Sequence, residues 1–132
     1  MNLAALATWQ PWLLSLLRFM SGLLLLQHGC QKLLGFPPPA AARVIEFGSL
    51  IWFSGVIELV GGVLLVIGLF TRPAAFICSG FTAVAYFMSH APRGFYPILN
   101  GGELAALYSF VFLYLFFAGP GPVSVDAKRG AE

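Results

Sequence analysis

The chain has 132 residues, of which 59% are hydrophobic and 9% are charged, and its formal net charge is +2. A soluble domain carries about 25% charged residues, so this composition, with a mean hydropathy of +0.88, excludes a protein that covers its own surface with polar side chains. The basic residues occur singly along the chain, which excludes nucleic-acid binding through a Lys/Arg cluster. The composition predicts an integral membrane protein in a lipid bilayer.

Four apolar segments follow one another along the chain, at about residues 11–34, 44–70, 73–90 and 102–118. Each approaches the roughly 20 residues that a membrane-spanning helix needs. Runs rich in Pro and Gly, which no helix continues through, end the first segment at residues 35–39 and the last at residues 119–122. We therefore predict one all-α transmembrane domain over residues 1–132, a four-helix bundle with both termini on the same side.

The distribution of Lys and Arg between the two sides of the membrane indicates orientation, because cytoplasmic loops carry an excess of them. Three basic residues lie on the side opposite the termini: Lys32, Arg43 and Arg93. Four lie on the side of the termini when one embedded residue is included: Arg18, Arg72, Lys128 and Arg129. The count favours cytoplasmic termini by one residue.

Arg18 and Glu58 are charged residues within the predicted helices, where an ionisable group costs about 2.5–3.5 kcal/mol unless it meets a partner or water. Arg18, Gly22 and Gly29 share one helix face with Lys32, and this face should meet Gly61 and Gly62 of the second helix. By depth, Arg18 is the nearest candidate to form an ion pair with Glu58. The alternative is that Arg18 extends to the lipid headgroups while Glu58 is neutral.

A second polar group lies on the side opposite the termini, at the ends of three helices. His28 and Lys32 are four residues apart, His90 ends the third helix, and Asn100 and Glu103 begin the fourth. These residues and the nearby aromatic side chains predict a ligand pocket under an aromatic lid, and the alternative is a set of charges solvated at the headgroups. The candidate ligand-binding residues are His28, Lys32, Glu58, Tyr86, His90, Phe95, Asn100, Glu103 and Tyr108.

No metal or nucleotide is expected from the motifs. His28, His90 and Glu103 carry suitable metal-binding groups, but no HxxxH or ExxH spacing places such ligands on one helix. Glycine-rich nucleotide motifs are missing as well. Cys30 and Cys78 should lie about 20 Å apart along the helix axes, which is too far for a disulfide.

The order and spacing of several short motifs resemble the DoxX family of bacterial and archaeal four-helix membrane proteins, over residues of about 12–129. The motifs are Arg18, His28-Gly29, Lys32-Leu33, Glu58 with Gly61-Gly62, Gly68 with Thr71-Arg72, Tyr86 with His90, Gly94-Phe95, Asn100-Gly101-Gly102-Glu103, Gly119 with Gly121, and Ser124 with Asp126. The resemblance implies a multi-pass protein of the bacterial or archaeal cytoplasmic membrane. It also implies a link to thiosulfate:quinone oxidoreductase or to thiol and oxidative stress.

From this resemblance the first hypothesis is a membrane subunit of a quinone-linked oxidoreductase, with a partner subunit and no assigned catalytic residue. Its quinone would accept hydrogen bonds from His28, Lys32 and His90 and lie among Tyr86, Phe95 and Tyr108, while Glu58 and Glu103 carry protons. Two alternatives stay open. One is an oligomeric transporter or channel for a small solute, and the other is an assembly or scaffold protein without a ligand. Glycine-lined helix faces favour a homodimer.

Overall fold

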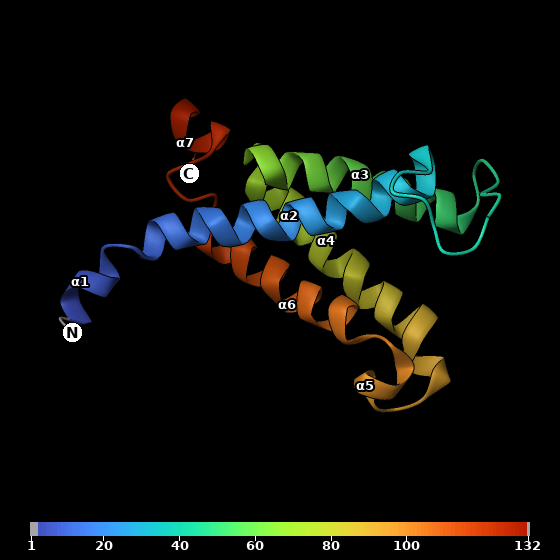
Figure 1. Cartoon of the computed structure of the whole chain (residues 1–132). Coiled ribbons are helices and arrows are strands. Elements are labelled where there is room, and N and C mark those ends of the chain that lie inside the picture. The colour runs from blue at the N-terminus through green and yellow to red at the C-terminus, as the bar shows by residue number, and fades with distance from the viewer. Residues whose placement is uncertain (1–2, 132) are drawn as a thin grey trace.

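A computed structural model describes residues 3–131, and the regular secondary structure in this part of the chain is helical. Two long helices form the first half, and two more with their connecting turns form the second half (Figure 1). The elements are α1 (Leu3–Ala7), α2 (Gln10–Leu34), α3 (Leu50–Ile67), α4 (Thr71–Ala85), the π-helical η1 (Tyr86–His90), the 3-10 helix η2 (Ala91–Arg93), α5 (Pro97–Asn100), α6 (Glu103–Ala118) and α7 (Val125–Arg129).

Within residues 3–131, three helical segments are long and apolar enough to cross a membrane: Gln10–Leu34, Leu50–Ile67 and Thr71–Arg93. The fourth apolar helix, α6, has 16 residues and spans about 24 Å at 1.5 Å per residue, less than the roughly 30 Å hydrocarbon core. The chain is thus an all-helical membrane protein with three candidate spans. A fourth span is a proposal considered below.

Capping residues determine where the second long helix begins and ends. The side chain of Ser49 accepts a hydrogen bond from the backbone N–H of Trp52, so α3 begins at Leu50. The sequence predicted a start near Val44, but residues 41–46 carry no helix. At the other end Gly68 takes a left-handed conformation with φ of 69°, which glycine adopts without strain.

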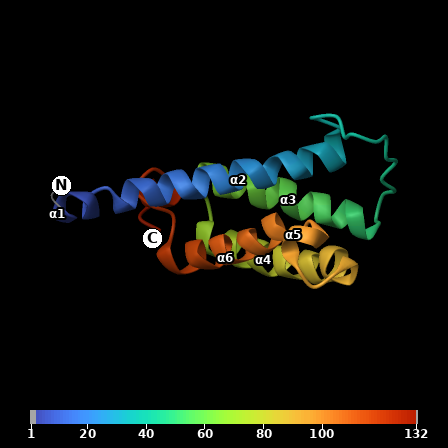
Figure 2. The ribbon, with the colours of Figure 1, turned by 60° about the horizontal axis from the view of Figure 1, so that its bottom comes forward.

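The long helices pack as two neighbouring pairs, α2 with α3 and α4 with α6, and α3 also contacts α4 (Figure 2). Glycine allows α2 and α3 to approach closely. A Cβ atom on Gly62 would lie 2.6 Å from the Cα of Leu26, and one on Gly22 would lie 2.8 Å from the Cβ of Leu65. The predicted glycine contact between these helices is therefore confirmed at Gly62, whereas Gly61 faces Cys78 of α4.

Arg18 links α2 to α3 and to the chain that follows α6. Its side chain is 2% exposed, and its guanidinium donates hydrogen bonds to four backbone carbonyls. The acceptors are Leu65, Val66 at 2.9 Å, Pro120 at 2.8 Å and Val123. The predicted ion pair between Arg18 and Glu58 is wrong, because carbonyl groups of α3 and of the segment after α6 occupy this guanidinium, and Glu58 pairs with Lys32 instead.

Asp126 of α7 holds the turn between α3 and α4. Its carboxylate accepts hydrogen bonds from the backbone N–H groups of Phe70, at 2.9 Å, and Thr71, at 2.8 Å. These groups lie at the start of α4, where no side chain of the turn itself provides a cap. A negative charge near the beginning of a helix is also favourable for the helix dipole.

We expect Gly62→Ala to destabilise the α2–α3 pair, because its new methyl group meets the backbone of Leu26. The expected loss is about 1–3 kcal/mol, measured as a lower thermal midpoint of the purified protein in detergent. Gly80→Ala is the matched control, since a Cβ there meets no atom within 4 Å. Equal midpoints for the two variants would contradict the proposed close approach.

We expect Asp126 to make stability depend on pH. Burial raises the pKa of this carboxyl, but the hydrogen bonds from Thr71 and Phe70 outweigh burial and hold the pKa below its ordinary 3.8. A carboxyl whose pKa is lower in the folded protein than in the unfolded chain stabilises the fold at pH values above its ordinary pKa. This stabilisation is lost as pH falls through the pKa of the folded protein. Asp126→Asn should cost about 1–2 kcal/mol near neutral pH, with a difference from wild type that shrinks below about pH 4. A difference in thermal midpoint that is independent of pH would count against this role.

Candidate functional site

A partly open cavity of about 520 Å³ lies between the two helix pairs, bordered by α2, α3, α4, η1 and α6. Apolar side chains form much of its wall. Five of the nine predicted ligand-binding residues line it: His28, Lys32, Glu58, His90 and Tyr108. The structure thus brings together polar residues from four helical segments, which the sequence placed only by depth.

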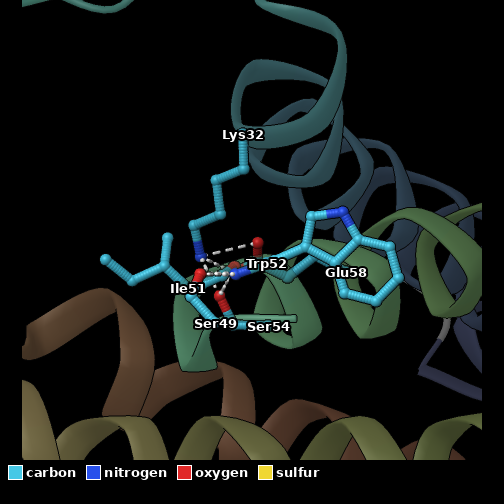
Figure 3. A network of polar contacts seen from close by, with 6 residues as sticks. All are labelled: Lys32, Ser49, Ile51, Trp52, Ser54 and Glu58. Atoms are coloured by element: carbon cyan, nitrogen blue, oxygen red, sulfur yellow. Dashed lines mark hydrogen bonds and ion pairs between the residues drawn. The ribbon is translucent and has the colours of Figure 1, made fainter. Parts of the chain in front are cut away.

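An ion pair between α2 and α3 lies in the cavity wall. The Nζ of Lys32 lies 2.9 Å from Oε1 and 2.8 Å from Oε2 of Glu58, and it also donates to the Oγ of Ser54 at 3.0 Å. Figure 3 shows Lys32 extending from α2 toward both α3 side chains. The Glu58 side chain is 9% exposed, so Lys32 is the partner that stabilises this carboxylate away from water.

Helix periodicity explains how both α3 groups meet the same lysine. Ser54 and Glu58 are four residues apart and therefore lie on one face of α3. Sequence analysis identified Glu58 but missed Ser54, although the four-residue spacing was a usable signal. His28 and Lys32 have the same spacing on α2, which is why both border the cavity.

Tyr108 of α6 is a lining residue of the cavity and carries a buried, unpaired hydroxyl. The residue is 6% exposed, and its ring stacks on Phe112 with centroids 5.2 Å apart. Its hydroxyl has no hydrogen-bond partner among residues 3–131. A buried polar group without a partner costs about 1–3 kcal/mol, so this hydroxyl is a favourable point for a ligand to accept a hydrogen bond.

Asn100 organises the turn that holds His90. Its side-chain Nδ2 donates to the Gly94 carbonyl at 2.9 Å and to the Tyr86 hydroxyl at 3.2 Å, while its Oδ1 accepts from the backbone of Gly102 at 2.8 Å. The Nδ1 of His90 lies 3.2 Å from the Asn100 carbonyl. A carbonyl only accepts hydrogen bonds, so His90 donates from Nδ1, and its Nε2 has no hydrogen-bond partner within residues 3–131.

Four predicted site residues do not line the cavity: Tyr86, Phe95, Asn100 and Glu103. The Tyr86 ring stacks on His90 with centroids 6.4 Å apart, and Asn100 is buried in the turn. Phe95 is 87% exposed and Glu103 is exposed as well. Phe95 therefore does not cover the cavity as the predicted aromatic lid, because it is not a lining residue and its ring contacts Tyr96 edge-on, with centroids 5.3 Å apart.

Arg43 and Arg93 line the cavity, and the sequence analysis used them only to infer orientation. Arg43 lies in the segment between α2 and α3, and Arg93 ends the 3-10 helix η2, so the periodicity of the long α-helices gives no information on where these side chains lie. Among residues 3–131 no group of three His, Cys, Asp or Glu side chains could hold a metal ion. Cys30 and Cys78 are both free thiols.

Two comparisons with known proteins identify relatives of this chain. A family model described as DoxX matches residues 13–91. An uncharacterized protein of Haemophilus influenzae is 45% identical over 124 residues, which cover 91% of this chain and 92% of that protein. Because that relative is uncharacterized, similarity to it assigns no activity. No solved structure matches the chain.

We expect Glu58→Gln to destabilise the protein, because it leaves the Lys32 ammonium beside a neutral amide in the cavity wall. The expected loss is about 1–3 kcal/mol, measured as a lower thermal midpoint in detergent. Combining it with Lys32→Met should cost less than the sum of the two single changes, because the partners are coupled. Glu103→Gln, at an exposed carboxylate outside the cavity, is the control. If the losses of the two single variants simply add up in the double variant, Lys32 and Glu58 are not coupled.

Proposed function

The chain belongs to the DoxX family, and from this premise we propose that it binds a quinone-like ring in the intramembrane cavity, as the membrane subunit of a quinone-linked oxidoreductase. A ring with carbonyl oxygens needs an apolar slot with a few hydrogen-bond donors. The cavity volume of about 520 Å³ falls within the range of roughly 300–1,000 Å³ typical of small-molecule sites.

The observation that carries this proposal is the unpaired Tyr108 hydroxyl. It belongs to the same cavity as Lys32, whose ammonium already points its three N–H groups at Glu58 and Ser54, so Tyr108 is the lining donor left for a carbonyl oxygen of a ligand. His90, through its Nε2, supplies an acceptor for a ligand hydroxyl. A donor and an acceptor together suit a ring whose oxygens are carbonyls in one redox state and hydroxyls in the other.

The subunit role follows from the chemistry that these residues offer. Tyr108 and His90 bind and orient a ring, and Glu58 provides a carboxylate next to it. A partner oxidoreductase subunit exchanges electrons with the ring in this proposal. In this proposal the chain lies in a bacterial cytoplasmic membrane as a four-helix bundle, in which α6 is a fourth, short span and both termini are on the cytoplasmic side. It functions either as a homodimer or together with that partner.

Two other functions of the same cavity make different predictions. An oligomeric transporter would carry a solute across liposome membranes, and Glu58→Gln would abolish that flux. A scaffold protein would bind its partner subunit without any ligand in the cavity. The unpaired Tyr108 hydroxyl favours ligand binding over the scaffold function, because a purely structural core leaves few buried polar groups without partners.

Tyr108→Phe tests the proposal directly, since it removes one oxygen atom and keeps the stacked ring. We expect the dissociation constant of a short-chain benzoquinone analogue to rise about fivefold to tenfold, measured on detergent-purified protein by equilibrium dialysis. Because the hydroxyl has no partner among the residues that the structure describes, the thermal midpoint without ligand should not fall.

The matched control is Tyr114→Phe, which removes a hydroxyl from an exposed position on the same helix. It should bind the analogue as the wild type does. Wild-type protein that shows no saturable binding, or a Tyr108→Phe variant with unchanged affinity, would overturn the proposed ring site.

A further inference from the structure

Two exposed arginines line the cavity without a hydrogen-bond or ion-pair partner in the described part of the chain. Arg43, in the segment between α2 and α3, and Arg93, in η2, both line the cavity and are exposed. Neither side chain has a hydrogen bond or ion pair within residues 3–131. We call the part of the cavity bordered by these two residues its mouth.

Two other arginines, Arg18 and Arg72, are bonded to backbone carbonyls, and Arg129 lies over the Phe70 ring at 5.4 Å from its centroid. Arg18 donates to four backbone carbonyls, and Arg72 donates to the carbonyls of Phe116, at 2.6 Å, and Phe117, at 2.7 Å. Both arginines lie near the turn between α3 and α4, which Asp126 also holds. The contrast between the two ends indicates that the guanidinium groups at the mouth are free to bind a group from outside the chain.

The charges that border the cavity favour an anion at the mouth. Glu58 is the carboxylate among the lining residues, and Lys32 already pairs with it. Glu46, Glu103 and Asp126 do not line the cavity. The two mouth arginines therefore contribute positive charge that no lining carboxylate balances, and guanidinium groups bind phosphate and carboxylate oxygens well.

The remaining walls favour a ligand with an apolar body. Besides the exposed arginines and the buried Tyr108, the cavity is bordered by side chains such as Leu25, Ile51, Phe53 and Leu104. Arg43 and Arg93 lie in segments at the ends of candidate membrane spans, where lipid headgroups and water are found. A ligand that enters from this level meets positive charge first and apolar surface next.

We propose that the mouth of this cavity binds the acidic head group of an amphiphile, a phosphate or a carboxylate, whose apolar body extends into the cavity. The head group contacts Arg43 and Arg93. The amphiphile is either a phospholipid of the surrounding membrane or a free single-chain acid, and the same chemistry recognises both. This binding site does not depend on a quinone-like ring, because it uses neither Tyr108 nor the Lys32–Glu58 pair.

The test measures binding of matched probes to the full chain, purified in a nonionic detergent. Dodecyl phosphate and dodecanoate represent free acids, and dodecanol has the same chain length without the charge. Short-chain phosphatidylglycerol and phosphatidylcholine form the lipid arm. If the natural ligand is a free acid, we expect dodecyl phosphate or dodecanoate to bind more tightly than dodecanol. If it is a phospholipid, we expect phosphatidylglycerol to bind more tightly than phosphatidylcholine. The proposal requires at least one of these two preferences.

Arg43→Gln and Arg93→Gln should each weaken binding of the preferred acidic probe about fivefold, and the double variant more strongly. Both positions are exposed, so folding should be unaffected, and an unchanged thermal midpoint checks this. Lys128→Gln removes the same charge from an exposed position in α7 and should bind as the wild type does.

Three results would overturn the proposal. The first is that dodecanol and phosphatidylcholine bind as tightly as their acidic counterparts. The second is that the double arginine variant retains full affinity. The third is that Lys128→Gln weakens binding as much as the arginine variants, which would indicate only nonspecific charge attraction. The ring site is tested separately through Tyr108→Phe. Failure of one proposal is therefore distinguishable from failure of the other.

Discussion

Every ionisable side chain within the apolar helices needs a partner inside the protein or contact with water, because lipid tails offer neither donors nor acceptors. Arg18 and Glu58 meet this requirement in different ways. The guanidinium of Arg18 gathers backbone carbonyls from α3 and from the segment after α6, whereas Glu58 pairs with Lys32 across the α2–α3 contact. Each solution ties together segments that are far apart in the chain.

As a result, the two ends of the packed helix pairs differ in how their polar groups are bonded. At the end where α3 meets α4, Arg18 and Asp126 bind backbone groups, and the C-terminal segment is held against the turn (Figure 1). At the other end, the wall that contains Lys32 and Glu58 borders a cavity, and buried donor capacity remains there at Tyr108. The charged groups Arg18 and Asp126 are thus bonded to backbone at one end, whereas the unpaired Tyr108 hydroxyl lies among the residues that line the cavity at the other.

Much of the helical architecture could be predicted from the sequence, because apolar length, Pro and Gly determine it locally. The first helix was expected at about 11–34 and lies at Gln10–Leu34. The start of α3 was placed too early, since an apolar run continues before Ser49 and only its side-chain cap marks the helix start. Of the site, five lining residues were predicted from their depth in the helices, whereas Arg43 and Arg93 lie in connecting segments without periodicity.

The sequence by itself determined that this is a helical membrane protein of the DoxX family, because composition and motif order do not depend on how the helices pack. Only the tertiary structure decided which charges meet. Depth alone favoured Arg18 as the partner of Glu58, whereas in the structure carbonyl groups of a distant segment occupy Arg18 and Lys32 pairs with Glu58. The unpaired hydroxyl of Tyr108 was likewise beyond sequence analysis, since the absence of a partner is a property of the packed neighbourhood and not of a residue.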